Sequence, residues 1–320
     1  MKRRSSIGDF FAKYAIVFVL MALMVIFAIA APKTFITEAN IFNILRQVAV
    51  VGIVAVGMTV VLLTGGIDLS VGSIIGVACV LAAELLLMGM NVFLVVAITL
   101  IASAGLGLVN GFFINVAKIP PLITTLAMMT TLRGVAYLIT GGMPVFGFDS
   151  AILVLGKGEL FGIIPVPVII MVFFFILGWL FLDKTRYGRY IYGVGGNEEA
   201  TRLSGVSVKK IRYIVFAISG FLSGVAGVVL LARINSGAPK SGQGYEMDVI
   251  TACVLGGVSI TGGEGKIGFV VIGVLFMGVL SNGMTLLNVQ EYVQWVIQGL
   301  ALIGAVSFDR VVQSRKARVD

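Results

Sequence analysis

Long apolar runs, separated by short polar or glycine-rich stretches, dominate this chain. Ten of the runs reach or approach the length of about 20 residues that an α-helix needs to cross a bilayer. They cover residues 14–31, 47–64, 70–90, 92–117, 122–141, 163–182, 211–233, 246–261, 267–287 and 293–308. The run 246–261 is short and rich in glycine, which fits either a full crossing or a broken, re-entrant segment. The pattern predicts an all-α integral membrane protein with about ten transmembrane helices, forming one domain over residues 1–320.

Composition strengthens this prediction. Apolar residues make up 59% of the chain and charged residues 12%, whereas a soluble domain carries about 25% charged residues. The mean hydropathy is +1.09. The 41 glycines also fit, because glycine is more frequent in membrane helices than in soluble ones.

The basic residues predict the orientation in the membrane. If the N-terminus is cytoplasmic and the runs alternate, the inside segments hold 17 of the 23 Lys and Arg residues and the outside loops hold four. The inside segments are 1–13, 118–121, 183–212, 262–266 and 309–320. Cytoplasmic loops are enriched in Lys and Arg, so both termini are expected inside. The net charge of +8 therefore reflects membrane topology, and no aromatic and basic platform indicates a nucleic-acid partner.

The first run could be misread as a secretory signal, because Ala28-Ile29-Ala30 resembles a signal-peptidase site. The run is long for such a signal, and many further spans follow it. We therefore expect an uncleaved first helix.

Small residues recur every four positions on two of the predicted helices, at Ser103, Gly107, Gly111 and Asn115 and at Ser219, Ser223 and Gly227. This spacing lets helix backbones approach closely in lipid. A weak internal echo links 65–70 with 256–261, where two glycines precede an apolar, polar, apolar and hydroxyl residue. Many transporters are internal duplications, but the spacing of the repeated elements differs here, so duplication stays open.

Several kinds of chemistry are missing from the sequence. It contains no histidine, and its two cysteines, Cys79 and Cys253, lie inside apolar runs without metal-type spacing. The stretch 262–267 is the nearest approach to a phosphate-binding P-loop, and it lacks the first glycine and the Ser/Thr that would bind Mg²⁺. We expect neither an enzyme nor a resident cofactor. A separate ATPase or an ion gradient would have to supply energy for active transport.

Polar residues at membrane depth are the candidates for a translocation pathway: Asp68, Ser70, Asn110, Asn115, Asn282 and Gln298. Each could instead make a hydrogen bond between helices. Gly65 and Gly66 break one helix, and Asp68 could cap the next by accepting backbone N–H bonds. A carboxylate at membrane depth is costly and usually functional, so Asp68 could also act in gating, and the two roles are compatible. The scarcity of intramembrane carboxylates gives weak support to ion coupling and suits a neutral, hydroxyl-rich solute.

The cytoplasmic loop 183–210 carries the signature of a short, capped helix. Asn197 is a good N-cap, and acidic residues follow it in the first turn, where the helix dipole favours them. Gly205 is a good terminator, and a second helix start follows at Ser207. We expect a helix over 198–204, which could be an ordinary ordered loop element or a surface that a soluble partner grips.

The chain resembles the ribose-type sugar permeases of ABC importers, in the superfamily that also contains branched-chain amino-acid permeases. The resemblance covers nearly the whole chain. It is strongest at Val56-Gly57-Met58-Thr59, at Thr64-Gly65-Gly66-Ile67-Asp68-Leu69-Ser70-Val71-Gly72, over 185–192 and 195–206, and at 255–257 with 262–263.

The resemblance implies a bacterial cytoplasmic membrane protein of the ten-helix importer type, embedded in membrane lipid. Its implied partners are a second permease copy, cytoplasmic ATP-binding subunits and an extracytoplasmic sugar-binding protein. The implied ATPase-coupling residues are Gly195, Asn197, Glu198, Ala200, Arg202, Leu203, Ser204 and Gly205. Glu198 and Arg202 would make polar contacts with the ATPase, and Leu203 would be an apolar anchor.

Three other functions remain possible from the sequence. An amino-acid or nucleoside permease of the same superfamily would need charge in the pathway that matches a charged solute. An ion-coupled secondary transporter would work without an ATPase. An integral membrane enzyme is disfavoured, because the sequence lacks histidine and any nucleophile motif.

Overall fold

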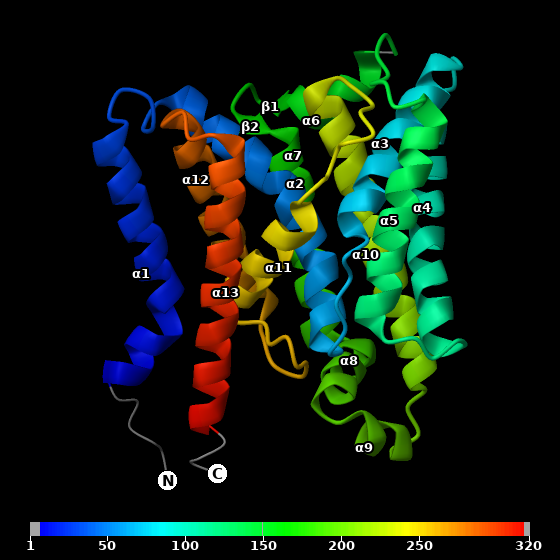
Figure 1. The fold of residues 1–320 in the computed structure, drawn as a ribbon, viewed down its shortest axis with the longest axis vertical. Helices are drawn as coiled ribbons and strands as arrows, with labels where there is room; N and C mark the ends of the chain where they lie inside the picture. Colours follow the sequence, from blue (N-terminus) through cyan, green and yellow to red (C-terminus); the bar gives the residue numbers. More distant parts are fainter. Residues whose placement is uncertain (1–6, 149, 317–320) are drawn as a thin grey trace.

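Long helices lying side by side make up most of the structure, a computed structural model that describes residues 7–148 and 150–316 (Figure 1). The long helices are α1 (Ile7–Ala30), α2 (Glu38–Leu63), α3 (Val71–Leu87), α4 (Val92–Asn115), α5 (Pro121–Thr140), α7 (Val166–Lys184), α10 (Val208–Ile234), α12 (Ile267–Leu286) and α13 (Glu291–Lys316). The short elements are η1 (Ser150–Leu153), α6 (Val154–Lys157), α8 (Arg186–Gly196), α9 (Glu198–Leu203), α11 (Tyr245–Leu255) and the antiparallel strands β1 (Glu159–Leu160) and β2 (Ile164–Pro165).

Each of the ten apolar runs overlaps a helix: α1 to α5, α7 and α10 to α13. Within the part of the chain that the structure describes, six of these are long and apolar enough to cross a membrane: α2, α4, α5, α7, α10 and α12. The helix in the run 246–261 is α11, which has 11 residues and is therefore about 16 Å long. This length is too short for a full crossing, so of the two alternatives that the sequence left open the structure favours the broken segment.

The start of α1, the end of α13 and the short helices α8 and α9 lie at one end of the bundle (Figure 1). The terminal segments 1–6 and 317–320, which hold several of the basic residues used to predict the orientation, lie outside the described residues.

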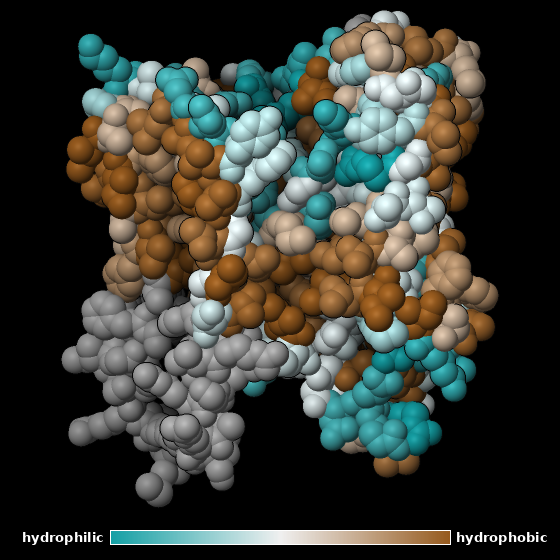
Figure 2. All heavy atoms as spheres, in the orientation of Figure 1, coloured by the Kyte–Doolittle hydropathy of each residue, from teal (hydrophilic) through white to brown (hydrophobic). Residues whose placement is uncertain are grey.

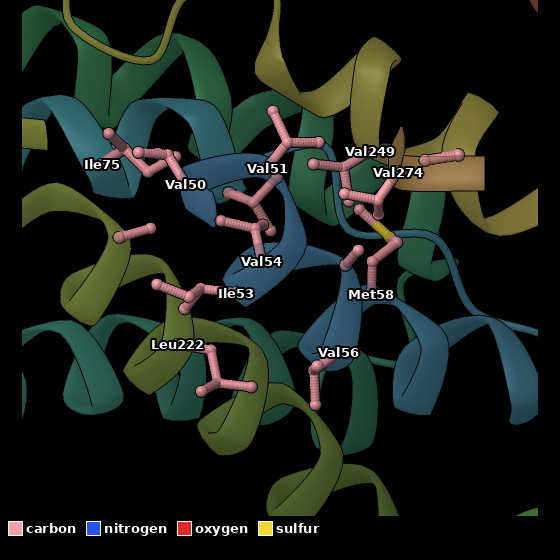
Figure 3. Close-up of a cluster of buried hydrophobic side chains, with 14 of the residues drawn as sticks. Val50, Val51, Ile53, Val54, Val56, Met58, Ile75, Leu222, Val249 and Val274 are labelled. Atoms are coloured by element: carbon pink, nitrogen blue, oxygen red, sulfur yellow. The ribbon is translucent and has the colours of Figure 1, made fainter. Parts of the chain in front are cut away.

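Helix α2 is the central element, because it is buried on every side over 48–63. Figure 3 shows its side chains pointing toward several neighbours, including Ile75 of α3, Leu222 of α10, Val249 of α11 and Val274 of α12. A helix that is apolar all round belongs in the interior of a bundle. The outer helices instead expose large apolar side chains, such as Phe93, Ile101 and Leu138, and apolar atoms cover much of the surface in Figure 2. This surface suits contact with lipid.

The small residues of α4 and α10 bring the two helices into backbone contact, as their spacing predicted. A Cβ atom added to Gly220 would lie 2.9 Å from the backbone nitrogen of Gly107. One added to Gly224 would lie 2.6 Å from the side chain of Ser103. Neither helix therefore has room for a larger residue at these positions.

We expect Gly220→Ala to lower the free energy of unfolding by about 1–3 kcal/mol, because the added methyl group meets backbone atoms that cannot rotate away. Gly105→Ala on α4 is the matched control, since nothing lies within 4 Å of its added Cβ. Thermal unfolding of the purified protein in detergent measures both. Equal melting temperatures for the two variants would contradict the close-packed interface.

Candidate functional site

The chain between α2 and α3, residues 64–70, does not form a helix and carries Asp68 into the protein interior. Oδ1 of Asp68 accepts hydrogen bonds from the backbone N–H of Ser70 (3.0 Å) and from its hydroxyl (2.6 Å). The cap position of α3 belongs to Ser70, whose side chain makes no cap hydrogen bond. The prediction that Asp68 caps this helix is therefore wrong, because its carboxylate accepts from the N–H of Ser70, before the first helical residue.

Two long helices extend this arrangement into a buried network. The side-chain amide of Asn110 on α4 donates to the Ser70 hydroxyl (2.8 Å). The Ser219 hydroxyl on α10 donates to Oδ2 of Asp68 (2.7 Å). All four residues are at most 1% exposed, and we call them the Asp68 network. It fixes the 64–70 segment to α4 and α10.

The structure brings together three of the six pathway candidates, Asp68, Ser70 and Asn110. Ser219 was predicted only as a packing residue. The signal that could have found it is a hydroxyl group among the small residues of α10. The described residues form no ion pair with Asp68, so hydroxyl and amide groups alone satisfy its oxygens.

The other pathway candidates lie elsewhere. Asn115 donates to the backbone oxygen of Lys209 (3.0 Å), and Asn282 exchanges two hydrogen bonds with Asn40 of α2 (2.8 and 3.0 Å). For these two residues, the interpretation as helix-to-helix hydrogen bonds is confirmed. Gln298 lies on α13, partly exposed.

A second polar cluster surrounds Arg133 of α5. Its guanidinium donates to the backbone oxygens of Pro239 (2.6 Å), Ser241 (2.9 Å) and Gly72 (3.1 Å). These bonds hold the loop before α11 against the first turn of α3. The carboxyl group of Glu246 packs on Gly72, where an added Cβ would lie 3.3 Å from its Cδ. Glu246 is one polar neighbour of α3 that the sequence did not single out.

The face of the molecule drawn in Figure 2 is hollowed between α13 and α5. Hydrophilic atoms gather in the hollow, toward the end of the bundle opposite α9. Apolar atoms form a continuous band nearer the α9 end.

The helix predicted over 198–204 is present as α9, which ends one residue earlier, at Leu203. Oδ1 of Asn197 accepts from the backbone N–H of Ala200 (2.9 Å), as expected of an N-cap. Gly205 has φ of +84°, the left-handed conformation that suits a glycine terminator. The next helix, α10, starts with Ser207 accepting from the N–H of Lys210 (3.4 Å).

The charged residues of α9 pair within the chain. Glu198 forms an ion pair with Arg212 of α10 (2.6 Å), and Glu199 forms one with Arg202 (2.5 Å). The hydrogen bond from Arg202 lowers the pKa of the Glu199 carboxyl below its usual value. Leu203 is 74% exposed, so α9 offers a partner an apolar side chain surrounded by polar ones.

Comparison with known proteins identifies the family. A family model described as branched-chain amino acid transport system / permease component matches residues 40–306. The chain belongs to this family. It is a transport permease and not an enzyme, and the resemblance to ribose-type permeases is confirmed by individual relatives.

Three relatives match over nearly their full lengths. The ribose import permease protein RbsC of Bacillus subtilis (strain 168) is 42% identical over 91% of this chain and 90% of its own. RbsC of Escherichia coli (strain K12) is 44% identical over 92% and 93%. The L-arabinose transport system permease protein AraH of the same strain is 42% identical over 99% and 96%. No solved structure matches the chain.

We expect Asp68→Ala to lower the free energy of unfolding by about 2 kcal/mol, because the buried Ser70 and Ser219 hydroxyls lose their acceptor. Asp68→Asn should retain most of the stability, since its amide oxygen can accept from Ser70 and its nitrogen can donate to Ser219. Chemical unfolding in detergent compares the two. An equal loss of unfolding free energy in the two variants would contradict this explanation. It would mean that the charge of the Asp68 carboxylate, and not its hydrogen-bond geometry, stabilises the 64–70 segment.

Proposed function

We propose that this chain is the membrane-spanning subunit of an ATP-driven importer for a monosaccharide such as a pentose. The observation that carries the proposal is the full-length similarity to permeases named for ribose and L-arabinose. The polar hollow agrees with a neutral, hydroxylated solute. A binding protein outside the membrane would deliver the sugar, and the chain itself would carry out no covalent chemistry.

In this proposal α9 is the helix that docks on the ATP-binding subunit. It is a short helix at one end of the bundle, its N-terminus is capped, and its ion pair with Arg212 fixes it to α10. Leu203 would enter an apolar cleft of the ATPase. Glu198 and Arg202 already form ion pairs within the chain, and these pairs would stabilise the position of α9. Their remaining hydrogen-bond donors and acceptors would contact the ATPase.

We further propose two permease copies in the complex, each with ten membrane-embedded helical segments of which α11 reaches only part of the way. Both termini would face the bacterial cytoplasm. The shared end of α1, α13 and α9 supports this orientation, as does the distribution of Lys and Arg. In the echo between 65–70 and 256–261, Gly65 has φ of +76° and its counterpart Gly256 has φ of −69°, so the backbone of this turn gives an internal duplication no support.

ATP binding would move α9 and rock the helices between outward-open and inward-open packings. The Asp68 network would act in this step as a latch beside the pathway. Both carboxylate oxygens of Asp68 and the hydroxyl of Ser70 are bound within the network and buried, so direct contact with sugar is the weaker role for these two residues. Asn110 keeps a buried side-chain oxygen without a hydrogen-bond partner.

The family description favours a second candidate, the import of a branched-chain amino acid. A zwitterionic solute would need both an acidic and a basic partner in the pathway. Arg133 and Glu246 supply such a pair near the first turn of α3. Uptake assays with both solutes separate the candidates.

We expect Leu203→Asp to abolish ATP-dependent uptake of radiolabelled D-ribose or L-arabinose in proteoliposomes containing the ATPase and the binding protein. Loss of an apolar anchor costs about 2 kcal/mol or more of binding energy, which weakens ATPase binding roughly 30-fold. Leu203→Met, which keeps an apolar side chain, is the control and should transport normally.

Uptake of L-leucine instead of either sugar would favour the amino-acid candidate. Uptake that needs no ATPase and follows a proton or sodium gradient would refute the importer.

A further inference from the structure

Three separate segments meet through glycine backbones next to α9. Gly195 lies in the last turn of α8, and its neighbours are the end of α2 and the turn 259–265 between α11 and α12. A Cβ atom on Gly195 would overlap the carbonyl oxygen of Leu63 and lie 2.5 Å from the nitrogen of Gly263. The same Leu63 oxygen accepts a hydrogen bond from that Gly263 nitrogen (3.0 Å).

Gly262 extends the contact to the start of the 64–70 segment. A Cβ atom on Gly262 would lie 2.9 Å from Cα of Gly195 and 2.7 Å from the nitrogen of Gly65. We call Gly65, Gly195, Gly262 and Gly263 the glycine clasp. The hydroxyl of Tyr192, one turn earlier on α8, donates to the backbone oxygen of Gly265 (2.9 Å) and reinforces the contact.

The clasp lies between α9 and the Asp68 network. On one side, only Gly196 and Asn197 separate Gly195 from α9. On the other side, Gly65 begins the segment that places Asp68 against α4 and α10. A contact between backbones cannot relax by rotating a side chain, so it transmits displacement more directly than an ordinary side-chain contact does.

We infer that Gly195 is a positioning residue of transport, which transfers the displacement of α9 through the glycine clasp to the 64–70 segment and its Asp68 network. This inference rests on the proposed function, in which the ATPase moves α9. The clasp itself touches neither ATP nor sugar, so its effect appears in the coupling between hydrolysis and uptake.

The chain contains a matched pair of sites for the test. Gly195 and Gly196 are adjacent in the last turn of α8, but nothing lies within 4 Å of a Cβ added to Gly196. An alanine at either position changes helix propensity by the same amount. Only Gly195→Ala pushes α8 away from Leu63 and Gly263, so a difference between the two variants reports the clasp.

The experiment uses proteoliposomes containing wild-type permease, Gly195→Ala or Gly196→Ala, each with the ATPase and the binding protein encoded beside it. Radiolabelled D-ribose uptake and phosphate release are measured together, and co-purification of the ATPase is checked for each variant. We expect Gly195→Ala to keep the ATPase bound and to lower the ratio of sugar imported to ATP hydrolysed by about fivefold or more. Gly196→Ala should match the wild type.

A wild-type ratio in Gly195→Ala, with the ATPase bound, overturns the inference and leaves the proposed function intact. A wild-type permease without ATP-dependent uptake overturns both. If Gly195→Ala does not reach the membrane folded, Tyr192→Phe decides, because it loosens the same contact without a steric clash. A lower ratio in Tyr192→Phe supports the inference, and an unchanged ratio refutes it.

Discussion

Close approach of helix backbones is the constraint on which the rest of this structure depends. In lipid, apolar side chains gain little by leaving the membrane for a protein interior, so helices associate through tight packing and hydrogen bonds. The α4 and α10 pair satisfies this requirement with Gly107, Gly220 and Gly224, whose Cα atoms leave no room for a side chain. That contact brings Asn110 of α4 to Ser70 and Ser219 of α10 to Asp68, so the polar network depends on the close approach of the two backbones.

The same closeness makes each buried polar group dependent on a partner from another element. Water is scarce at membrane depth, and burying a polar group there without a hydrogen-bond partner costs about 2 kcal/mol or more of stability. Asp68 is satisfied by hydroxyl groups from two segments, and Arg133 by three backbone carbonyls. Both clusters converge on the stretch 68–72, where the chain enters α3. The first turn of α3 is thus bound both by the Asp68 network and by Arg133. A conformational change that repacks α3 would have to alter one of these two sets of hydrogen bonds.

The glycine clasp connects α9, at one end of the bundle, to the segment that enters α3. Helix α9 is held to α10 by one exposed ion pair, whose stabilisation is modest and screened by salt. Its link to the membrane part through α8, Leu63 and Gly263 is instead a contact between backbone atoms, which cannot relax by rotating a side chain. A partner that moves α9 therefore acts on a stiff connection, while the ion pair can adjust.

The sequence by itself determined the class of protein, the positions of the apolar helices, the caps of α9 and the family. These properties depend on hydropathy, local hydrogen bonding and glycine conformation, all of which act over a few residues. The short length of α11 did not follow from the sequence, whose glycine-rich run 246–261 fitted either a full crossing or a broken segment. Only the tertiary structure decided which polar residues meet. Asn110 and Asn115 look alike along α4, yet Asn110 donates to the Ser70 hydroxyl and Asn115 to the backbone oxygen of Lys209, because the packing of α4 sets their neighbours. Ser219, Glu246 and the Glu198–Arg212 pair follow from the same cause, since contacts between residues distant in sequence depend on how whole helices pack.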